Sequence, residues 1–272
     1  MPATPSLQAS PPLLEFEAAR LTLDADLPPT RPLDLRLSPG ELVMVDATDV
    51  PRSAALADAA CGLAPPASGR VRFLGHDWNA VPPDSANALR GLMGRLLPEG
   101  AWIDQLSTVD NVLLQRLHHG TRGRRHLVSQ AAELARHFGL PGIPLARPSR
   151  LTLEDRRRAS MVRAFLGMPR LVLIEPLPHL ADTEFLEPLV NALRRLRDRG
   201  GAALWLTLDG RVWRDASLPV TRRLRIIGLT AEAGSEVVAS CRAAGMDACL
   251  SKPVPREELI TAIARTHLGV PA

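Results

Sequence analysis

Two uninterrupted apolar runs constrain the fold of this chain more than any other feature. RLVLIEPLP, residues 170–178, is apolar up to the acid Glu175, and AALWLTLD, residues 202–209, has the same character. Between them apolar residues recur at helical spacing over 185–196. Strands that are apolar on both faces and joined by a helix are typical of a parallel sheet with helices on both sides. The sequence therefore predicts an α/β fold with a mainly parallel sheet.

Further strands and helices are predicted around these runs. Residues 13–23 alternate as in an edge strand, and a Pro-Gly turn within 32–46 separates two more strands, which gives an N-terminal antiparallel β part. The other predicted elements are helices over 53–62, 84–92 and 126–139, a turn and strand over 68–78, and a helix that begins after Thr152 as N-cap, with Asp155 at its third position.

Size and composition favour a globular protein without membrane spans. The chain has 272 residues, 46% of them hydrophobic, which is enough for one large or two modest domains. No apolar run approaches the roughly 20 residues that cross a bilayer. Residues 1–12 are rich in Pro, Ser and Ala and are predicted to be a disordered leader. We therefore expect a cytoplasmic protein.

Charge and cysteine content exclude several classes of function. The net charge is +4, but the basic residues are scattered and no tyrosine is present to stack on bases, so nucleic acid is not an expected partner. Cys61, Cys241 and Cys249 are too far apart for a zinc motif, and their odd number does not suggest a disulfide framework. Lys252 is the single lysine among 33 basic residues. Any chemistry that requires lysine must use it.

The order of motifs over residues 13–215 resembles the ATP-binding subunit of an ABC transporter. SPGELVMV corresponds to the strand before the Walker A loop, and AACGLAPPASGRVRFLGHDW to the segment after that loop. LPEGAWIDQLSTVDNVLL is similar to the Q-loop region, and SRLTLEDRRRASMVRAFLGMPRLVLIEPLP to the signature and Walker B segments without gaps. The subfamily most suggested serves phospholipid trafficking and organic-solvent resistance. The resemblance implies a P-loop-NTPase-like sheet flanked by helices.

The family's phosphate-binding residues are replaced in this chain. When GPSGSGKST is aligned with ATDVPRSAA, residues 47–55, Ser53 stands at the lysine and Ala54 at the magnesium-binding hydroxyl. Arg52 is the only nearby cation. Preceding loop positions are occupied by Asp49, Val50 and Pro51. Proline has no N–H, valine resists positive φ, and an aspartate repels phosphate. The resemblance thus implies a degenerate loop.

The other nucleotide-contacting positions depart from the family in the same direction. Pro98 stands at the position of the Q-loop glutamine, and Leu208 stands at the position of the switch histidine. Thr152, Leu153 and Glu154 lie in the aligned signature segment, in which Leu153 and Glu154 replace two glycines. Glu175 aligns with the metal-binding aspartate and Pro176 with the catalytic glutamate. A shift by one residue would make Glu175 the catalytic acid, but it would displace Asp182 from the D-loop aspartate that it matches.

Simpler structural interpretations exist for several of these residues. Glu175 at a strand end is equally compatible with a solvated or capping acid, and Asp182 with a turn residue. His118 and His119 are predicted to lie exposed in a polar loop. The Arg156 to Arg158 run is predicted to be a solvated helix face.

From Ile226 onward the sequence resembles the C-terminal half of a response-regulator receiver domain. The run LT.....AAGMD..LSKP carries the match, with Thr230 at the switch threonine and Lys252 at the lysine that contacts the phosphoryl group in a complete receiver. Residues 226–272 are too few to bury a core alone, so we expect this βαβα tail to dock on the larger sheet or to remain partly loose. In one alternative, segments 42–49 and 171–178 supply the missing receiver strands. In the other, Lys252 is a remnant of gene fusion.

These resemblances imply a leader over 1–12, an ABC ATP-binding-like domain over 13–225 and a partial receiver over 226–272. The expected function is that of a non-hydrolytic structural or regulatory subunit without cofactor, peripheral to the inner membrane. Its expected partner is an integral-membrane permease or an active ATPase subunit. One alternative is a weak ATPase that uses ATP and Mg, with Arg52 for binding and Glu175 for catalysis. Another is a phosphorelay module whose tail binds a histidine kinase or a partner receiver.

Overall fold

The computed structural model describes residues 11–23, 30, 32–47, 49–98, 101–119, 123–178, 180, 184–224, 227–230, 239 and 248–268. Three sequence predictions fall outside these ranges. They are most of the N-terminal leader, Asp182, and most of the first helix of the predicted βαβα tail.

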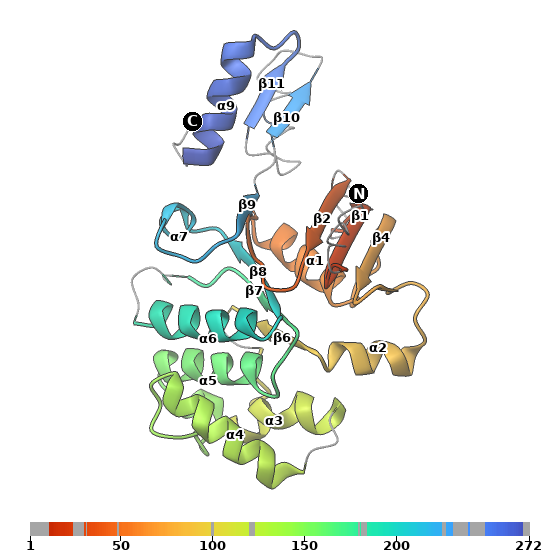
Figure 1. Ribbon diagram of the computed structural model, residues 1–272. Coiled ribbons are helices and arrows are strands. Elements are labelled where there is room, and N and C mark those ends of the chain that lie inside the picture. The colour runs from red at the N-terminus through yellow and green to blue at the C-terminus, as the bar shows by residue number, and fades with distance from the viewer. Residues whose placement is uncertain are drawn as a thin grey trace, which may run out of the picture.

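A five-stranded parallel sheet forms the centre of the fold, in the order β6-β7-β8-β3-β9 (Figure 1). Its strands are β3 (Leu42–Asp46), β6 (Met93–Leu96), β7 (Leu171–Ile174), β8 (Ala202–Thr207) and β9 (Arg222–Leu224). In register, Leu204 of β8 lies between Leu173 of β7 and Val43 of β3. The parallel sheet predicted from the two apolar runs is confirmed.

The N-terminal strands form a second, antiparallel sheet in the order β2-β1-β4-β5. Its strands are β1 (Leu14–Arg20), β2 (Leu33–Leu37), β4 (Ser68–Phe73) and β5 (His76–Asp77). The prediction of an edge strand for β1 is wrong, because β1 is hydrogen-bonded to β2 on one side and β4 on the other. The Pro-Gly turn after β2 is confirmed, with Gly40 at φ +80°, but it passes the chain from one sheet to the other.

Helices connect the strands and cover the parallel sheet. They are α1 (Val50–Ala60), α2 (Pro83–Arg90), α3 (Thr108–His119), α4 (Arg124–His137), α5 (Leu153–Phe165), α6 (Leu186–Asp198) and α7 (Gly210–Arg214), with a short 3-10 turn over Pro148–Arg150. The helices predicted at 53–62, 84–92, 126–139, after Thr152 and at 185–196 are confirmed. His118 and His119 lie in the last turn of α3 and not in a loop.

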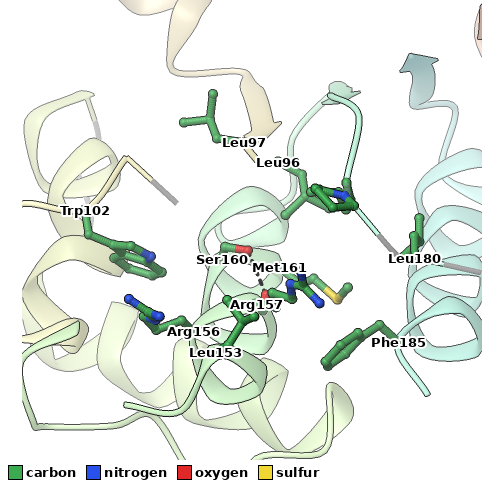
Figure 2. Close-up of a pocket in the computed structure, with 12 residues that line it drawn as sticks. Leu96, Leu97, Trp102, Leu153, Arg156, Arg157, Ser160, Met161, Leu180 and Phe185 are labelled. Carbon is green, nitrogen blue, oxygen red and sulfur yellow. Dashed lines mark hydrogen bonds between the residues drawn. The ribbon is translucent and has the colours of Figure 1, made fainter. Parts of the chain in front are cut away.

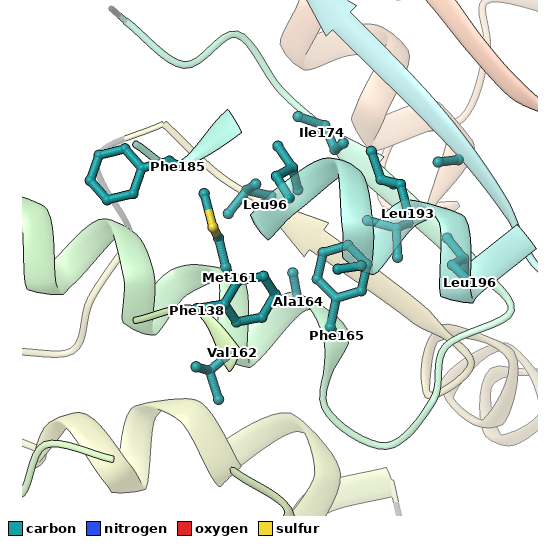
Figure 3. Close-up of a cluster of buried hydrophobic side chains, with 14 of the residues drawn as sticks. Leu96, Phe138, Met161, Val162, Ala164, Phe165, Ile174, Phe185, Leu193 and Leu196 are labelled. Carbon is teal, nitrogen blue, oxygen red and sulfur yellow. The ribbon is translucent and has the colours of Figure 1, made fainter. Parts of the chain in front are cut away.

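The parallel sheet is buried on both faces, which explains its apolar strands. Leu171 and Leu173 belong to a core with α1 and the antiparallel sheet, whereas Val172 and Ile174 belong to a core with α3 to α6. This alternation follows from the two-residue period of a strand. In Figure 3, Met161, Phe165 and Leu193 lie in the second core, between helices of its α-helical layer.

The C-terminal segment forms a small sheet of its own. Strand β10 (Ile227–Thr230) pairs in parallel with β11 (Ala248–Ser251), and helix α9 (Arg256–Leu268) follows (Figure 1). Within the described residues neither strand joins the five-stranded sheet. The alternative in which β3 and β7 supply the missing receiver strands therefore disagrees with the strand order.

Strand β6 passes against helix α5 at a position where no side chain fits. A Cβ atom on Gly94 would lie 1.8 Å from the carbonyl oxygen of Ala164. Because that neighbour is backbone, the contact is relieved only by moving β6 away from α5. The glycine therefore determines how closely this strand and helix pack.

We expect Gly94→Ala to lower the free energy of unfolding by about 2 kcal/mol or more, as overpacking against backbone does. Gly142→Ala is the matched control, because a Cβ there meets no atom within 4 Å. Urea unfolding of both variants measures the difference. Equal effects of the two substitutions would contradict the close packing of β6 on α5.

Candidate functional site

The loop between β3 and α1 stands where the resemblance places a phosphate-binding loop, and its described amides are hydrogen-bonded within the chain. The N–H of Ala47 donates to the carbonyl of Thr207 at 3.1 Å, and the N–H of Asp49 donates to the carbonyl of Ala47 at 2.6 Å. Pro51 has no N–H to offer. The N–H of Ser53 donates to the carbonyl of Asp49 at 3.2 Å as the helix begins.

The Asp49 side chain caps helix α1. Its carboxylate accepts a hydrogen bond from the N–H of Arg52 at 2.8 Å and forms an ion pair with the Arg52 guanidinium. A helix N-terminus attracts anions through its free N–H groups and its dipole. Here an anion from the chain itself occupies that position, and Arg52, the predicted replacement for the lysine, binds it.

The two positions after Arg52 are a buried serine and a half-buried alanine. Ser53 is 1% exposed and Ala54 is half-buried. A serine side chain is shorter than lysine and carries no charge, and alanine has no oxygen with which to bind a metal ion. The structure thus places Arg52, Ser53 and Ala54 in succession near the N-terminus of α1.

Glu175, at the end of β7, is buried and ion-paired. Its side chain is 5% exposed, and its Oε1 lies 2.5 Å from Nε of Arg95 on β6. The same guanidinium reaches Asp58 on α1, with Nη1 2.6 Å from Oδ1. The interpretation of Glu175 as a solvated acid is therefore wrong, because the neighbouring strand supplies a cation.

Burial and the neighbouring carboxylates shift the pKa of Arg95 in opposite directions. Burial disfavours the charged guanidinium of Arg95, but its hydrogen bond to Glu175 and the attraction of that carboxylate raise its pKa above the usual value. Burial raises the pKa of the nearby Cys61 thiol to about 12. The Arg95 guanidinium therefore stays charged at pH 7, beside a Cys61 thiol that stays neutral.

Sequence reasoning missed Arg95, although a signal for it exists. Strand β6 pairs in parallel with β7, and Arg95 is its one charged residue within MGRL. The N–H of Glu175 also donates to the carbonyl of Leu96 at 3.0 Å. A charged residue in a short buried strand requires a partner, and the acid at the end of the adjacent strand meets that need.

The N-terminus of α5 is capped as predicted. The Oγ1 of Thr152 accepts a hydrogen bond from the N–H of Asp155 at 3.0 Å. Glu154 forms an ion pair with Arg158, whose guanidinium also lies 5.4 Å from the centre of the Phe185 ring. The prediction of a purely solvated Arg156 to Arg158 face is wrong, since the Arg158 side chain is only 15% exposed.

A small pocket lies beside the N-terminal half of α5 (Figure 2). Its cavity volume is about 60 Å³, and Trp102, Arg156, Arg157 and Phe185 are among its lining residues. The Ser160 hydroxyl donates to the carbonyl of Arg157 at 2.7 Å. The pocket combines an apolar lining with two guanidinium groups. It lies where the segments that resemble the Q-loop, signature and D-loop of the family come together.

The remaining predicted site residues lie in the C-terminal segment or outside the described residues. Asp182 lies outside the described residues. Thr230 ends β10 directly opposite Ser251 of β11, and Lys252 follows β11 and is exposed. Within the described ranges no group of three or more His, Cys, Asp or Glu side chains is arranged to hold a metal ion.

The described part of the chain contains no helix that is both long and apolar enough to span a bilayer.

The fold is that of ABC transporter ATP-binding cassettes. A dimeric ATP-binding cassette, MJ0796, in a post-hydrolysis state bound to ADP and Pi, matches with a TM-score of 0.64 at 19% identity, over 74% of this chain and 90% of that one. A structure titled as the ATP binding subunit of an ABC transporter matches with the same TM-score at 16% identity, over 93% of this chain and 99% of that one. No family model matches the chain.

Macrolide export ATP-binding/permease proteins named MacB are sequence relatives. The one from Chromobacterium violaceum is 29% identical over 177 residues, which cover 64% of this chain and 27% of that protein. The one from Chlorobium luteolum is 26% identical over 225 residues, which cover 82% of this chain and 33% of that protein. This chain thus resembles an ABC transporter ATP-binding subunit and spans a third or less of the length of these two relatives.

We expect Arg95→Met to lower the free energy of unfolding by about 3 kcal/mol, because it leaves Glu175 buried without its cation. The double variant Arg95→Met/Glu175→Met should recover most of this loss, since an apolar pair replaces a buried ion pair. Arg36→Met is the control. Arg36 forms an ion pair with Glu15, but its side chain is 75% exposed. Loss of this surface ion pair is expected to lower the free energy of unfolding by less than about 1 kcal/mol.

Chemical denaturation of the unaltered chain, the two single variants and the double variant checks this expectation. A double variant as unstable as Arg95→Met would contradict the importance of the ion pair.

Proposed function

We propose that this chain is an ABC ATP-binding-subunit-like protein that neither binds nor hydrolyses ATP and serves as a structural or regulatory subunit of a transport complex. The observation that carries this proposal is the Asp49 carboxylate at the N-terminus of α1. A triphosphate seated there would have to displace it or lie against it.

Electrostatics supports the proposal. Two unit negative charges about 4 Å apart repel by about 4 kcal/mol at an effective dielectric of about 20. Arg52 does not offset this cost, because its guanidinium is already paired with Asp49. The loop amides of Ala47 and Asp49 are hydrogen-bonded within the chain and are not free to bind phosphate.

The residues present do not fit a magnesium nucleotide. Ala54 lacks the hydroxyl that would bind the metal, and Glu175 holds the Arg95 guanidinium at 2.5 Å. An acid bound this way is neither a metal ligand nor a general base unless the ion pair breaks.

The proposed partner is an integral-membrane permease or an active ATPase subunit, with the chain peripheral to the inner membrane. The relatives are named ATP-binding/permease proteins, so in them the two functions are joined in one chain. A pocket of about 250 Å³ near the C-terminal end of α1, lined in part by Arg90, His119 and Arg163, supports this proposal. Leu63, which also lines it, is 58% exposed. An acidic amphipathic segment of the partner would complement these groups.

Titration with fluorescent ATP and Mg²⁺ tests the proposal. We expect no saturable binding by the unaltered chain at about millimolar nucleotide. The variant Asp49→Ser/Val50→Gly/Pro51→Ser/Arg52→Gly/Ser53→Lys/Ala54→Ser should gain binding by at least about tenfold, because it restores the loop glycines and N–H groups, the cation and the metal-binding hydroxyl.

Two results would favour the alternative of a weak ATPase. One is micromolar binding that is lost in Arg52→Ala. The other is magnesium-dependent hydrolysis that is abolished by Glu175→Gln.

A second candidate function is phosphorelay signalling through a receiver-like tail. Strands β10 and β11 are parallel and α9 follows them, as in the C-terminal half of a receiver. The ends of both strands place Thr230 and Lys252 at the same edge of the small sheet. This placement is the observation that favours a tail which binds a histidine kinase or a partner receiver.

For this second function we expect the full chain, but not a chain that ends at Leu224, to bind a histidine kinase or receiver from the same organism. Lys252→Ala should weaken that binding by at least about fivefold, and Arg256→Ala on the same segment should not. Surface plasmon resonance against purified kinases and receivers measures it. Equal binding by the full and shortened chains would refute a role for the tail.

A further inference from the structure

Helices α3 and α4 and the ends that join them form a basic surface. Residues 111–132 include four arginines and three histidines but no acidic residue. The two helices lie side by side at one end of the molecule (Figure 1). Among the described residues of this stretch, the exposed basic side chains are those of His118, Arg124, Arg125 and His126. A surface that gathers one sign of charge favours a partner of the opposite sign.

Exposed leucines share a face of α3 with one of these basic residues. Leu114 is 45% exposed and Leu117 is 38% exposed, whereas the solvent face of a helix normally carries polar residues. Leu117 and His118 follow Leu114 by three and four residues, so the three side chains lie on one face of the helix. A single exposed leucine is common on protein surfaces, but a pair of leucines beside basic side chains makes the surface amphipathic.

An ion pair places the start of α4 beside this face. Nη2 of Arg124, the first residue of α4, lies 2.7 Å from Oδ1 of Asp110, which is four residues before Leu114 on α3. The Arg124 side chain therefore lies along the face that carries the leucines. Asp110 neutralises Arg124. The next residue, Arg125, is exposed and has no ion pair within the described part of the chain, so its charge is available to a partner.

A buried arginine on α3 adds to the positive charge. Arg116 is 8% exposed and donates to the backbone carbonyls of Gly91 and Met93. Within the described part of the chain no carboxylate pairs with it. Burial lowers the pKa of its guanidinium to about 10, so Arg116 stays charged at pH 7. Burial and neighbouring positive charges, including that of Arg116, also lower the pKa of His119.

We infer that this surface binds the anionic headgroups of a phospholipid bilayer, with Leu114 and Leu117 in the interfacial region and Arg125 against the headgroups. Leucines and arginines side by side are typical of helices that lie on membranes. His119 of the same helix lines the pocket proposed as the permease contact, and a permease is embedded in the bilayer. The inference rests on the proposed function for this location beside a membrane, but not on the absence of nucleotide binding.

Cosedimentation of the full chain with vesicles tests the inference. Vesicles of phosphatidylglycerol and phosphatidylcholine in equal parts should bind the chain at least about fivefold more strongly than vesicles of phosphatidylcholine alone, because one arginine near an anionic bilayer contributes about this factor. Sodium chloride at about 0.5 M should remove most of the difference, since it shortens the Debye length to about 4 Å.

Variants with matched controls locate the surface. Arg125→Gln should weaken binding to the anionic vesicles about fivefold, whereas Arg194→Gln, which removes an exposed arginine from α6, should not. Leu114→Gln/Leu117→Gln should weaken binding at least about fivefold, because two apolar side chains no longer enter the interfacial region. Leu145→Gln, which removes a leucine that is 76% exposed outside this surface, should leave binding unchanged. Circular dichroism confirms that the variants fold.

Three results would overturn the inference. They are equal binding to the two kinds of vesicle, unchanged binding by the leucine double variant, and equal weakening by Arg125→Gln and Arg194→Gln. Beads that carry polyglutamate present an acidic polypeptide without lipid. Retention on these beads as strong as on the anionic vesicles, with the same loss in the leucine double variant, would assign the surface to an acidic protein and also overturn the inference. No nucleotide is present in these experiments, so their outcome is independent of the ATP titration that tests the proposed function.

Discussion

The position of every functional segment depends on the burial of β3 between two strands and two cores. It is hydrogen-bonded to β8 on one side and β9 on the other, with Leu42 and Met44 in one core and Val43 in the other. Because the strands are parallel, the ends of β3, β7 and β8 lie along the same edge of the sheet. The capped loop before α1 and the acid after β7 therefore lie along the same edge of the sheet, with the end of β8 between them, although they are more than a hundred residues apart.

The chain supplies its own counterions along that edge. Asp49 is paired with Arg52, and Arg95 joins Glu175 to Asp58. In an active cassette, the resemblance implies that phosphate and metal ion would provide such charges from outside. Self-pairing is thus the physical basis of the proposed non-hydrolytic role, and it also ties α1, β6 and β7 together.

The elements that could be predicted from sequence are those with a strong local signal. Strands β7 and β8 are apolar runs, α5 has a capping threonine, and α6 has regular apolar spacing. Strands β6 and β9 could not be predicted, because MGRL and RRL carry glycine or charge and become strands only by pairing with β7 and β3. The prediction of β1 as an edge strand was wrong for a related reason. Alternation of apolar and polar residues does not reveal how many neighbouring strands pair with a strand.

For the candidate site, the sequence located α1 and Glu175 but not their partners. The ion pair between Arg95 and Glu175 joins residues eighty positions apart, and its one signal, a charge within MGRL, can be recognised only once that segment is known to be the strand β6. Burial and pairing across the fold, rather than residue type, determine these properties.

The cap made by Asp49 has a consequence for how the loop changes during evolution. As the N-cap of α1 it contributes about 1 kcal/mol to helix stability whether or not any ligand binds. Selection for a well-folded protein therefore retains it even where selection for nucleotide use is absent. Under the proposed function, a change of Asp49 alone toward a glycine loop would lower stability without creating a nucleotide site, because several further substitutions would also be needed.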